Sequence, residues 1–146
     1  MRAGMRAAFG IALTLAVLAP GAARANELDN MQGTWRITYA AVGNKVANAK
    51  QLKAMSVLID GNKFTLIEGA GQKEVVHFTP YPRRKPREVE FKRGKGDAKL
   101  LWHGIYELEG EKTRFRLCWG PAGANRPRSF EAKRRDDHRL FILEKE

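Results

Sequence analysis

Residues 28–39 read Leu-Asp-Asn-Met-Gln-Gly-Thr-Trp-Arg-Ile-Thr-Tyr, and this stretch decides the fold. After Gly33, the large side chains Trp35, Ile37 and Tyr39 alternate with Thr and Arg, and Ala41 continues the same face. Strict alternation is typical of a strand that buries one face. Because Gly33 allows a tight backbone turn, we predict that the first strand begins there and points the Trp35 indole inward.

The remaining chain repeats this pattern in short segments separated by turn residues. Asp60-Gly61-Asn62 is a strong hairpin signal, and three prolines in residues 80–86 exclude a central strand or helix there. Gly104 favours a bulge or bend, and Asn48 is a candidate cap for a short helix at 48–55. The further strands are expected at 56–59, 63–68, 72–79, 87–93, 100–109, 113–119, 128–133 and 139–145. We therefore predict an all-β, up-and-down antiparallel barrel of eight or nine strands with one short helix.

The first 25 residues are typical of a secretory signal peptide. Arg2 and Arg6 precede an apolar run over residues 7–19, and Ala23-Arg24-Ala25 has the small-x-small form of a cleavage site. The run is too short for a membrane anchor, which needs about 20 apolar residues. We expect export to the periplasm or the exterior, with residues 26–146 as one barrel domain. Removing residues 1–25 would lower the net charge from +11 to +8, because it removes three arginines and no acid.

Several short blocks follow one another in an order that resembles a known family. They are Gln-Gly-Thr-Trp at 32–35, Asp-Gly-Asn-Lys-Phe-Thr-Leu at 60–66, Lys-Pro-Arg-Glu-Val-Glu at 85–90, Gly-Ile-Tyr-Glu-Leu-Glu-Gly at 104–110, Leu-Cys at 117–118, Arg-Pro-Arg-Ser-Phe-Glu at 126–131 and Leu-Phe-Ile-Leu-Glu-Lys at 140–145. The chain resembles the uncharacterised lipocalin-like domain family that is expanded in planctomycete bacteria. The resemblance implies a lipocalin-like barrel in an exported or envelope protein, and it supplies no catalytic or binding residues. Glu90 departs from the Asp expected in that family.

The sequence offers no clear catalytic, metal or cofactor site. Neither Ser56 nor Ser129 lies in a Gly-flanked nucleophile elbow, and the three histidines make no ligand-spaced pair. The pairs Glu88/Glu90 and Glu107/Glu109 are interpreted as the solvated faces of strands. Cys118 is the only cysteine, and we expect it to be a packed structural thiol. We therefore predict a protein that is not an enzyme and has no cofactor.

The aromatic side chains suggest a ligand pocket. Those expected to face inward either line a cavity for a small apolar or amphipathic molecule or fill the core completely, and the sequence leaves both readings open. We also expect a basic side chain of the last strand to stack over Trp35, with Arg139 as the candidate. The candidate pocket residues are Trp35, Tyr39, Phe64, Phe91, Trp102, Tyr106, Phe115, Trp119 and Arg139.

Positive charge is the one compositional anomaly, with 27 Lys and Arg against 16 Asp and Glu. The clusters lack the interleaved aromatic residues that stack nucleic-acid bases, and an exported protein rarely meets nucleic acid. The alternative function is therefore an envelope module that binds polyanions, anionic lipid or acidic proteins. Its candidate residues are Arg83, Arg84, Lys85, Arg87, Lys92 and Arg93, with further basic residues at Lys95, Lys133, Arg134 and Arg135.

Overall fold

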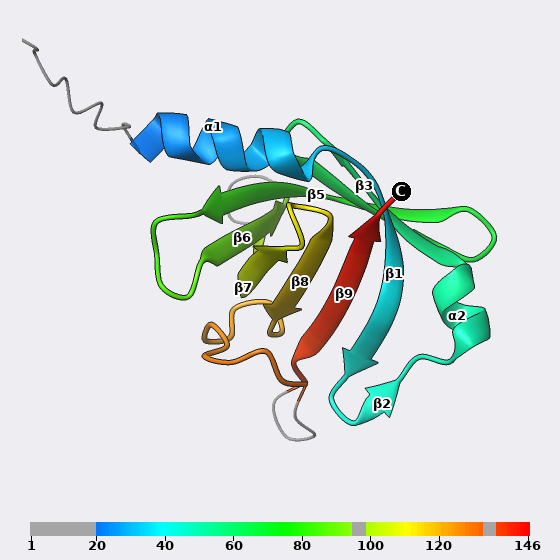
Figure 1. Ribbon diagram of the computed structural model, residues 1–146. Coiled ribbons are helices and arrows are strands. Elements are labelled where there is room, and N and C mark those ends of the chain that lie inside the picture. Colours follow the sequence, from blue (N-terminus) through cyan, green and yellow to red (C-terminus); the bar gives the residue numbers. More distant parts are fainter. Residues whose placement is uncertain (1–19, 95–98, 133–136) are drawn as a thin grey trace, which may run out of the picture.

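The computed structural model of the protein describes residues 20–94, 99–132 and 137–146 (Figure 1). Over these residues the chain forms nine strands and two helices. The strands are β1 (Gly33–Val42), β2 (Lys45–Val46), β3 (Met55–Asp60), β4 (Lys63–Glu68), β5 (Gln72–Tyr81), β6 (Glu88–Arg93), β7 (Leu100–Glu109), β8 (Arg114–Trp119) and β9 (Arg139–Lys145). The helices are α1 (Pro20–Met31) and α2 (Ala49–Lys53).

The strands form one antiparallel sheet that closes on itself. Its order in the described part of the chain is β2-β1-β3-β4-β5-β6-β7-β8-β9. The strand β1 also pairs with β9, from Trp35 opposite Lys145 to Val42 opposite Arg139. This pairing closes eight strands into a barrel and leaves β2 as a short addition to β1 (Figure 1). The protein is therefore a lipocalin-like up-and-down β-barrel, which confirms the predicted fold class.

Local sequence signals account for the turns that the sequence predicted. Asp60 pairs with Lys63, so that Gly61 and Asn62 form a two-residue turn, and Gly61 has a φ of +59°. Helix α2 begins after Asn48, whose side chain accepts a hydrogen bond from the Gln51 amide, while the Gln51 side chain accepts one from the Asn48 amide. This reciprocal capping box satisfies amide groups that the short helix cannot pair internally.

A bulge in β1 corrects the prediction for Tyr39. Ile37 lies opposite Leu143, but Tyr39 lies opposite Ile142, so that Thr38 is an extra residue in the ladder. Such an insertion reverses the alternation of faces beyond it. Ala40 therefore enters the core, and Tyr39 lies outside the core cluster. The prediction that Tyr39 faces inward with Trp35 and Ile37 is wrong for this reason.

Two strand predictions also need correction. Residues 128–132 form no strand and belong to an irregular segment, 120–132, that lies against the outer face of the barrel, while residue 133 lies outside the described residues. Strand β5 continues through Pro80, which lies opposite Val89. Strand β5 pairs with β4 only from Gln72 to His77, so at Pro80 it is paired on one side only, with β6. A proline without an N–H group is tolerated at such a strand end.

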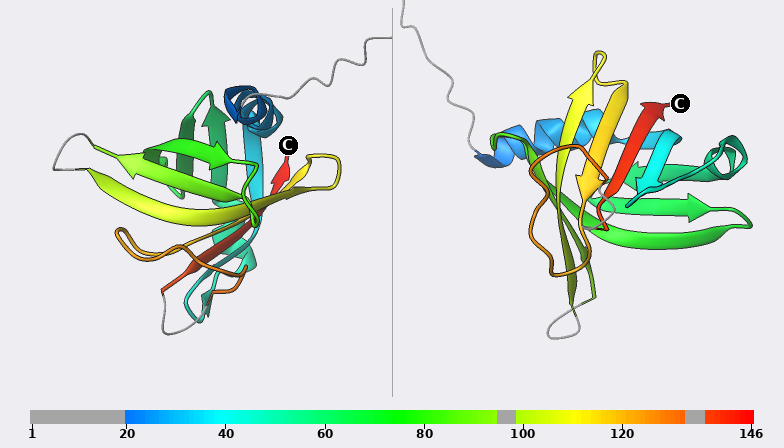
Figure 2. Two further views of the ribbon diagram at one scale, coloured as in Figure 1. Left: turned by 90° about the vertical axis from the view of Figure 1, so that its left-hand side faces the viewer. Right: turned by 90° about the horizontal axis from the view of Figure 1, so that it is seen from below.

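Helix α1, which was not among the predicted elements, lies across one end of the barrel (Figures 1 and 2). Met31 at its end is fully buried, and its carbonyl oxygen accepts a hydrogen bond of 2.8 Å from Trp35 Nε1. The Glu27 carboxylate accepts hydrogen bonds from Tyr106 Oη at 3.0 Å and Arg87 Nη1 at 3.1 Å. These contacts tie α1 to the end of the barrel that it covers. Neither described helix has the length and apolar character needed to cross a membrane.

Candidate functional site

The barrel interior is filled at one end and hollow at the other. At the end under α1, Trp35 packs on Phe115 with ring centroids 5.7 Å apart, and Phe115 packs on Tyr106 at 5.8 Å. All three side chains are buried. Three of the predicted pocket residues, Trp35, Tyr106 and Phe115, therefore fill the end of the barrel under α1, and Tyr106 also borders a groove of about 460 Å³ beside Phe130. Tyr39 lies on the outside, as the bulge requires.

A cavity of about 130 Å³ lies toward the opposite end of the barrel. Five of the nine predicted pocket residues line it, and its other three lining residues were not predicted. The lining residues are Phe64, Leu66, Glu74, Val76, Phe91, Trp102, Trp119 and Arg139. Leu66 follows Phe64 by two residues on the same face of β4, and Val76 pairs with Phe64 across the ladder. The two-residue period and the hairpin register were the signals that could have found them.

Aromatic contacts connect the side chains of the cavity wall. Phe91 meets Phe64 at a centroid distance of 5.2 Å and Trp119 at 5.7 Å. On the far side, Trp119 meets Phe141 edge to face at 4.8 Å. Edge-to-face and tilted ring pairs of this kind are favourable beyond their buried area. The aromatic side chains of the wall are therefore packed against one another beside the cavity.

The prediction that a basic residue of β9 stacks over Trp35 is confirmed, but the residue is Lys145 and not Arg139. Lys145 Nζ lies 5.6 Å from the centre of the Trp35 ring. Strands β1 and β9 are antiparallel, so the end of β9 lies beside the start of β1 and its beginning lies beside Val42. Arg139 consequently lies at the hollow end and lines the cavity.

A wider and shallower groove of about 570 Å³ adjoins the cavity. It runs between the β1–β2 turn and α2, and its lining includes Val42, Val46, Met55 and Phe141. Val42 and Val46 are exposed. Arg139 lines both the groove and the cavity. The edge-to-face pair of Trp119 and Phe141 links the two hollows, since Trp119 lines the cavity and Phe141 lines the groove.

The two charged side chains that line the cavity, Glu74 and Arg139, differ in whether they have a partner. Glu74 Oε1 accepts a hydrogen bond of 3.0 Å from Arg93, and that guanidinium lies 5.6 Å from the centre of the Trp102 ring. Arg139 forms no ion pair or hydrogen bond through its side chain with any other residue of the described ranges 20–94, 99–132 and 137–146. The mouth of the cavity therefore carries one compensated carboxylate and one guanidinium that its described neighbours leave without a counterion.

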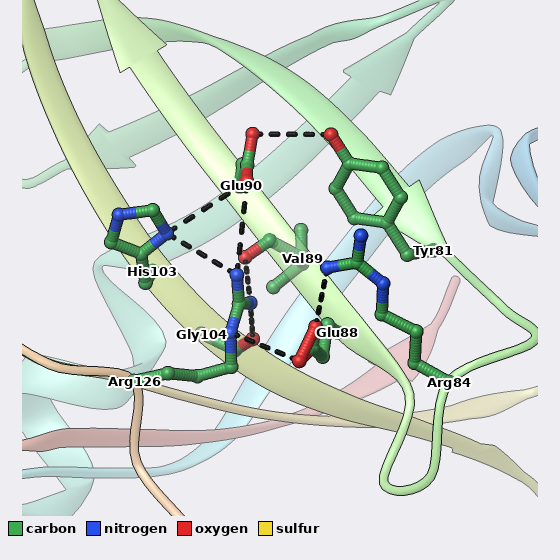
Figure 3. A network of polar contacts seen from close by, with 8 residues as sticks. All are labelled: Tyr81, Arg84, Glu88, Val89, Glu90, His103, Gly104 and Arg126. Atoms are coloured by element: carbon green, nitrogen blue, oxygen red, sulfur yellow. Dashed lines mark hydrogen bonds and ion pairs between the residues drawn. The ribbon is translucent and has the colours of Figure 1, made fainter.

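A polar network lies on the outer face of the barrel, across β6 and β7 (Figure 3). Arg126 Nη1 donates to the carbonyl oxygens of Val89 at 2.9 Å and Gly104 at 2.6 Å, and its Nε lies 3.3 Å from Glu88. Glu90 accepts a hydrogen bond of 3.1 Å from Tyr81. Burial, with the neighbouring Glu90 charge, raises the pKa of Tyr81.

This network has a structural role. Arg126 comes from the 120–132 segment and joins it to two strands of the barrel, while Arg84 neutralises Glu88 from the other side at 2.7 Å (Figure 3). Glu88 and Glu90 are half-buried and paired with cations. The pair therefore lies on the outer face of its strand, as expected, but its carboxylates are partly shielded from solvent.

Cys118 lies beneath the same segment. Its side chain is fully buried, and Sγ lies 3.7 Å from the carbonyl oxygen of Glu131. Burial raises the pKa of the Cys118 thiol to about 11. Because the thiolate is the nucleophilic form, the burial and the raised pKa both disfavour reaction of Cys118 at neutral pH. The expectation of a packed structural thiol is confirmed.

The six candidate polyanion residues do not act as a uniform basic surface. Arg84 pairs with Glu88, Arg87 with Glu27 and Arg93 with Glu74. All six are exposed, and Arg84, Lys85 and Arg87 border a groove of about 460 Å³ beside Phe130. Lys95, Lys133, Arg134 and Arg135 lie outside the described residues. Much of the positive charge in the described clusters is thus balanced locally.

The fold and the cavity together define a class: a small lipocalin-like barrel closed at one end and hollow at the other. Among the residues that the structure describes, no three His, Cys, Asp or Glu side chains come together in a group that could hold a metal ion. No family model, curated protein or solved structure matches the chain. The resemblance to the planctomycete lipocalin-like family stays a prediction.

Proposed function

We propose that the protein is an exported, non-enzymatic barrel that binds a small apolar molecule at its hollow end. The observation that carries the proposal is the cavity of about 130 Å³ lined mainly by aromatic and aliphatic side chains. Apolar cavities near this size, of about 150 Å³, accept a single benzene ring. A monocyclic ring or a short branched chain fits the hollow, and a larger ligand would extend into the adjoining groove.

The expected affinity follows from the apolar surface area of the ligand that binding removes from water. A single ring that buries about 150 Å² of apolar surface gains about 4 kcal/mol at about 25 cal/mol per Å², which corresponds to a Kd of about 1 mM. A ligand that also covers the groove would bind more tightly because it buries more surface. The first measurement therefore uses a simple probe at millimolar concentration.

Toluene is a suitable probe because it carries no charge and has one ring. The chain has three tryptophans, and two of them, Trp102 and Trp119, line the cavity while Trp35 lies at the filled end. With 5-fluorotryptophan incorporated, ¹⁹F NMR distinguishes the three. Toluene should shift the Trp102 and Trp119 resonances saturably and leave the Trp35 resonance in place. A saturable shift at Trp35 alone, or none at all, would contradict the proposal.

Neighbouring valines on β5 supply a matched pair of variants. Val76→Phe adds a ring inside the cavity, whereas Val75→Phe adds the same ring at a position that is 49% exposed on the outer face. We expect the first variant to lose toluene binding at least tenfold and the second to bind as the unmodified chain does. Equal binding by both variants would place the probe outside the cavity.

Export is the second part of the proposal, and it rests on residues 1–25. Cleavage after Ala25 would leave Glu27 and Met31, which tie α1 to the barrel, in the mature chain. Expression of the full sequence with its leader in a bacterial host, followed by mass measurement of the protein in the periplasmic fraction, tests this. We expect a chain that starts at Asn26. Retention of residues 1–25 in the cytoplasmic fraction would overturn it.

The exposed basic turn supports a second candidate function, binding to polyanions. Arg83, Arg84, Lys85 and Arg87 are all exposed, and the last three border the groove at Phe130. Contacts between exposed charges weaken when salt shortens the Debye length. Retention on heparin at low salt that disappears by about 0.3 M salt is the expected result. Passage through the column at low salt would remove this candidate and leave the cavity proposal intact.

A further inference from the structure

The position of Arg139 indicates which chemical class of ligand the hollow end selects. Its side chain lines the cavity and the groove at once, at the start of β9. Among the residues that the structure describes, Glu74 is the only other charged residue that lines the cavity, and Arg93 already compensates it at 3.0 Å. A ligand in the cavity therefore meets one guanidinium that no described carboxylate neutralises.

The groove does not supply the missing counterion. Its lining contains Lys45, Glu68 and Arg139 as charged residues, so that the set carries a net charge of +1. Neither Glu68 nor any other described carboxylate is ion-paired with Arg139. The remaining lining of both hollows is mainly aromatic or aliphatic, with Gln51 as an uncharged polar residue in the groove.

From this arrangement we infer that the preferred ligand is a small apolar acid whose ring or chain enters the cavity and whose carboxylate pairs with Arg139 at the mouth. The inference rests on the proposed function and adds the ligand's charge to it. Guanidinium is a planar fork that pairs with a carboxylate through two parallel hydrogen bonds. The aromatic wall excludes water from the apolar part of the ligand and leaves its charged end beside Arg139.

The size of the preference follows from the exposure of Arg139. A fully desolvated charged hydrogen bond would be worth more, but Arg139 reaches solvent, and solvent screens an exposed pair. We expect an anionic ligand to bind about five- to tenfold more tightly than a neutral ligand of the same shape. The preference should shrink at high salt because the charges at the mouth are accessible to ions.

Benzoate and toluene form the test pair, since they differ by one carboxylate in place of a methyl group. Both are titrated into the fluorotryptophan-labelled full chain at low and high salt, with the Trp102 and Trp119 resonances as the readout. The variants are Arg139→Gln and, as a control, Arg114→Gln at the opposite end of the barrel. Arg139→Lys keeps the charge without the fork.

The unmodified chain and Arg114→Gln should prefer benzoate about five- to tenfold, and Arg139→Gln should bind both probes with the affinity of toluene. Arg139→Lys should keep part of the preference. Toluene binding without a preference for benzoate would overturn this inference and leave the proposed function standing. A benzoate preference that survives in Arg139→Gln would overturn the role of Arg139. If neither probe binds, both proposals fail.

Discussion

The hydrogen bond between Tyr106 and Glu27 joins α1 to the closed end of the barrel, and its removal gives a measurable loss of stability. Tyr106 is buried, and its hydroxyl donates to Glu27 Oε1 over 3.0 Å. The Glu27 side chain is 12% exposed. A shielded hydrogen bond to a charged acceptor contributes about 1.5–3 kcal/mol. We expect Tyr106→Phe to lower the free energy of unfolding by about 2 kcal/mol.

The assay is urea unfolding, with a double-mutant cycle to isolate the contact. Tyr106→Phe, Glu27→Gln and the double variant should show a coupling energy of about 1–2 kcal/mol. For a domain of this size, a loss of about 2 kcal/mol lowers Tm by roughly 8 °C. Arg87→Gln is the control, because Arg87 is 44% exposed and its ion pair with Glu27 is worth less than about 1 kcal/mol.

Alkaline pH offers an independent check of the same group. Burial and the Glu27 charge raise the pKa of Tyr106 far above its ordinary value of 10.0. As pH rises, Tyr106 therefore loses its hydroxyl proton first in the unfolded chain. Its contribution to the free energy of unfolding is fully present below pH 10 and is lost progressively above it. Tyr106→Phe should reduce this fall. A coupling energy near zero, together with the same loss of stability above pH 10 in Tyr106→Phe as in the unmodified chain, would refute the reasoning that this contact fastens α1.

Three further predictions concern strands β7 and β8 and the 120–132 segment that covers them. Gly104→Ala should lower the free energy of unfolding in urea by about 2–3 kcal/mol, because the added Cβ would lie 2.8 Å from the Cys118 carbonyl oxygen. Gly120→Ala is the control: its Cβ would meet nothing closer than 3.4 Å, so the loss should be less than half as large. The raised pKa of Cys118, about 11 against an ordinary 9.0, predicts that part of the stability is lost between pH 9 and 11, and Cys118→Ala should remove that loss. Arg126→Gln should loosen the 120–132 segment and speed the maleimide labelling of Cys118 at least tenfold, and an unchanged rate would show that the segment is held by other contacts.

Local pattern was sufficient to predict most of the strands, because each one alternates faces with a period of two and ends at its own turn signal. The Trp35 indole, the Gly61–Asn62 turn and the Asn48 cap could be placed from neighbouring residues alone. Helix α1 could not, because its residues show no apolar stripe. Its described end is held by contacts with distant positions, Tyr106 and Arg87 among them.

The sequence by itself determined the all-β class, the order of the hairpins and the inward face of most strands, since these depend on residues close together in the chain. Tertiary structure decided which residues meet across the barrel. The bulge at Thr38 turned Tyr39 outward, and the antiparallel closure of β1 on β9 put Lys145 over Trp35 and Arg139 at the cavity. Whether aromatic rings fill an interior or enclose a space depends on distances between strands far apart in sequence, and alternation along one strand carries no information about them.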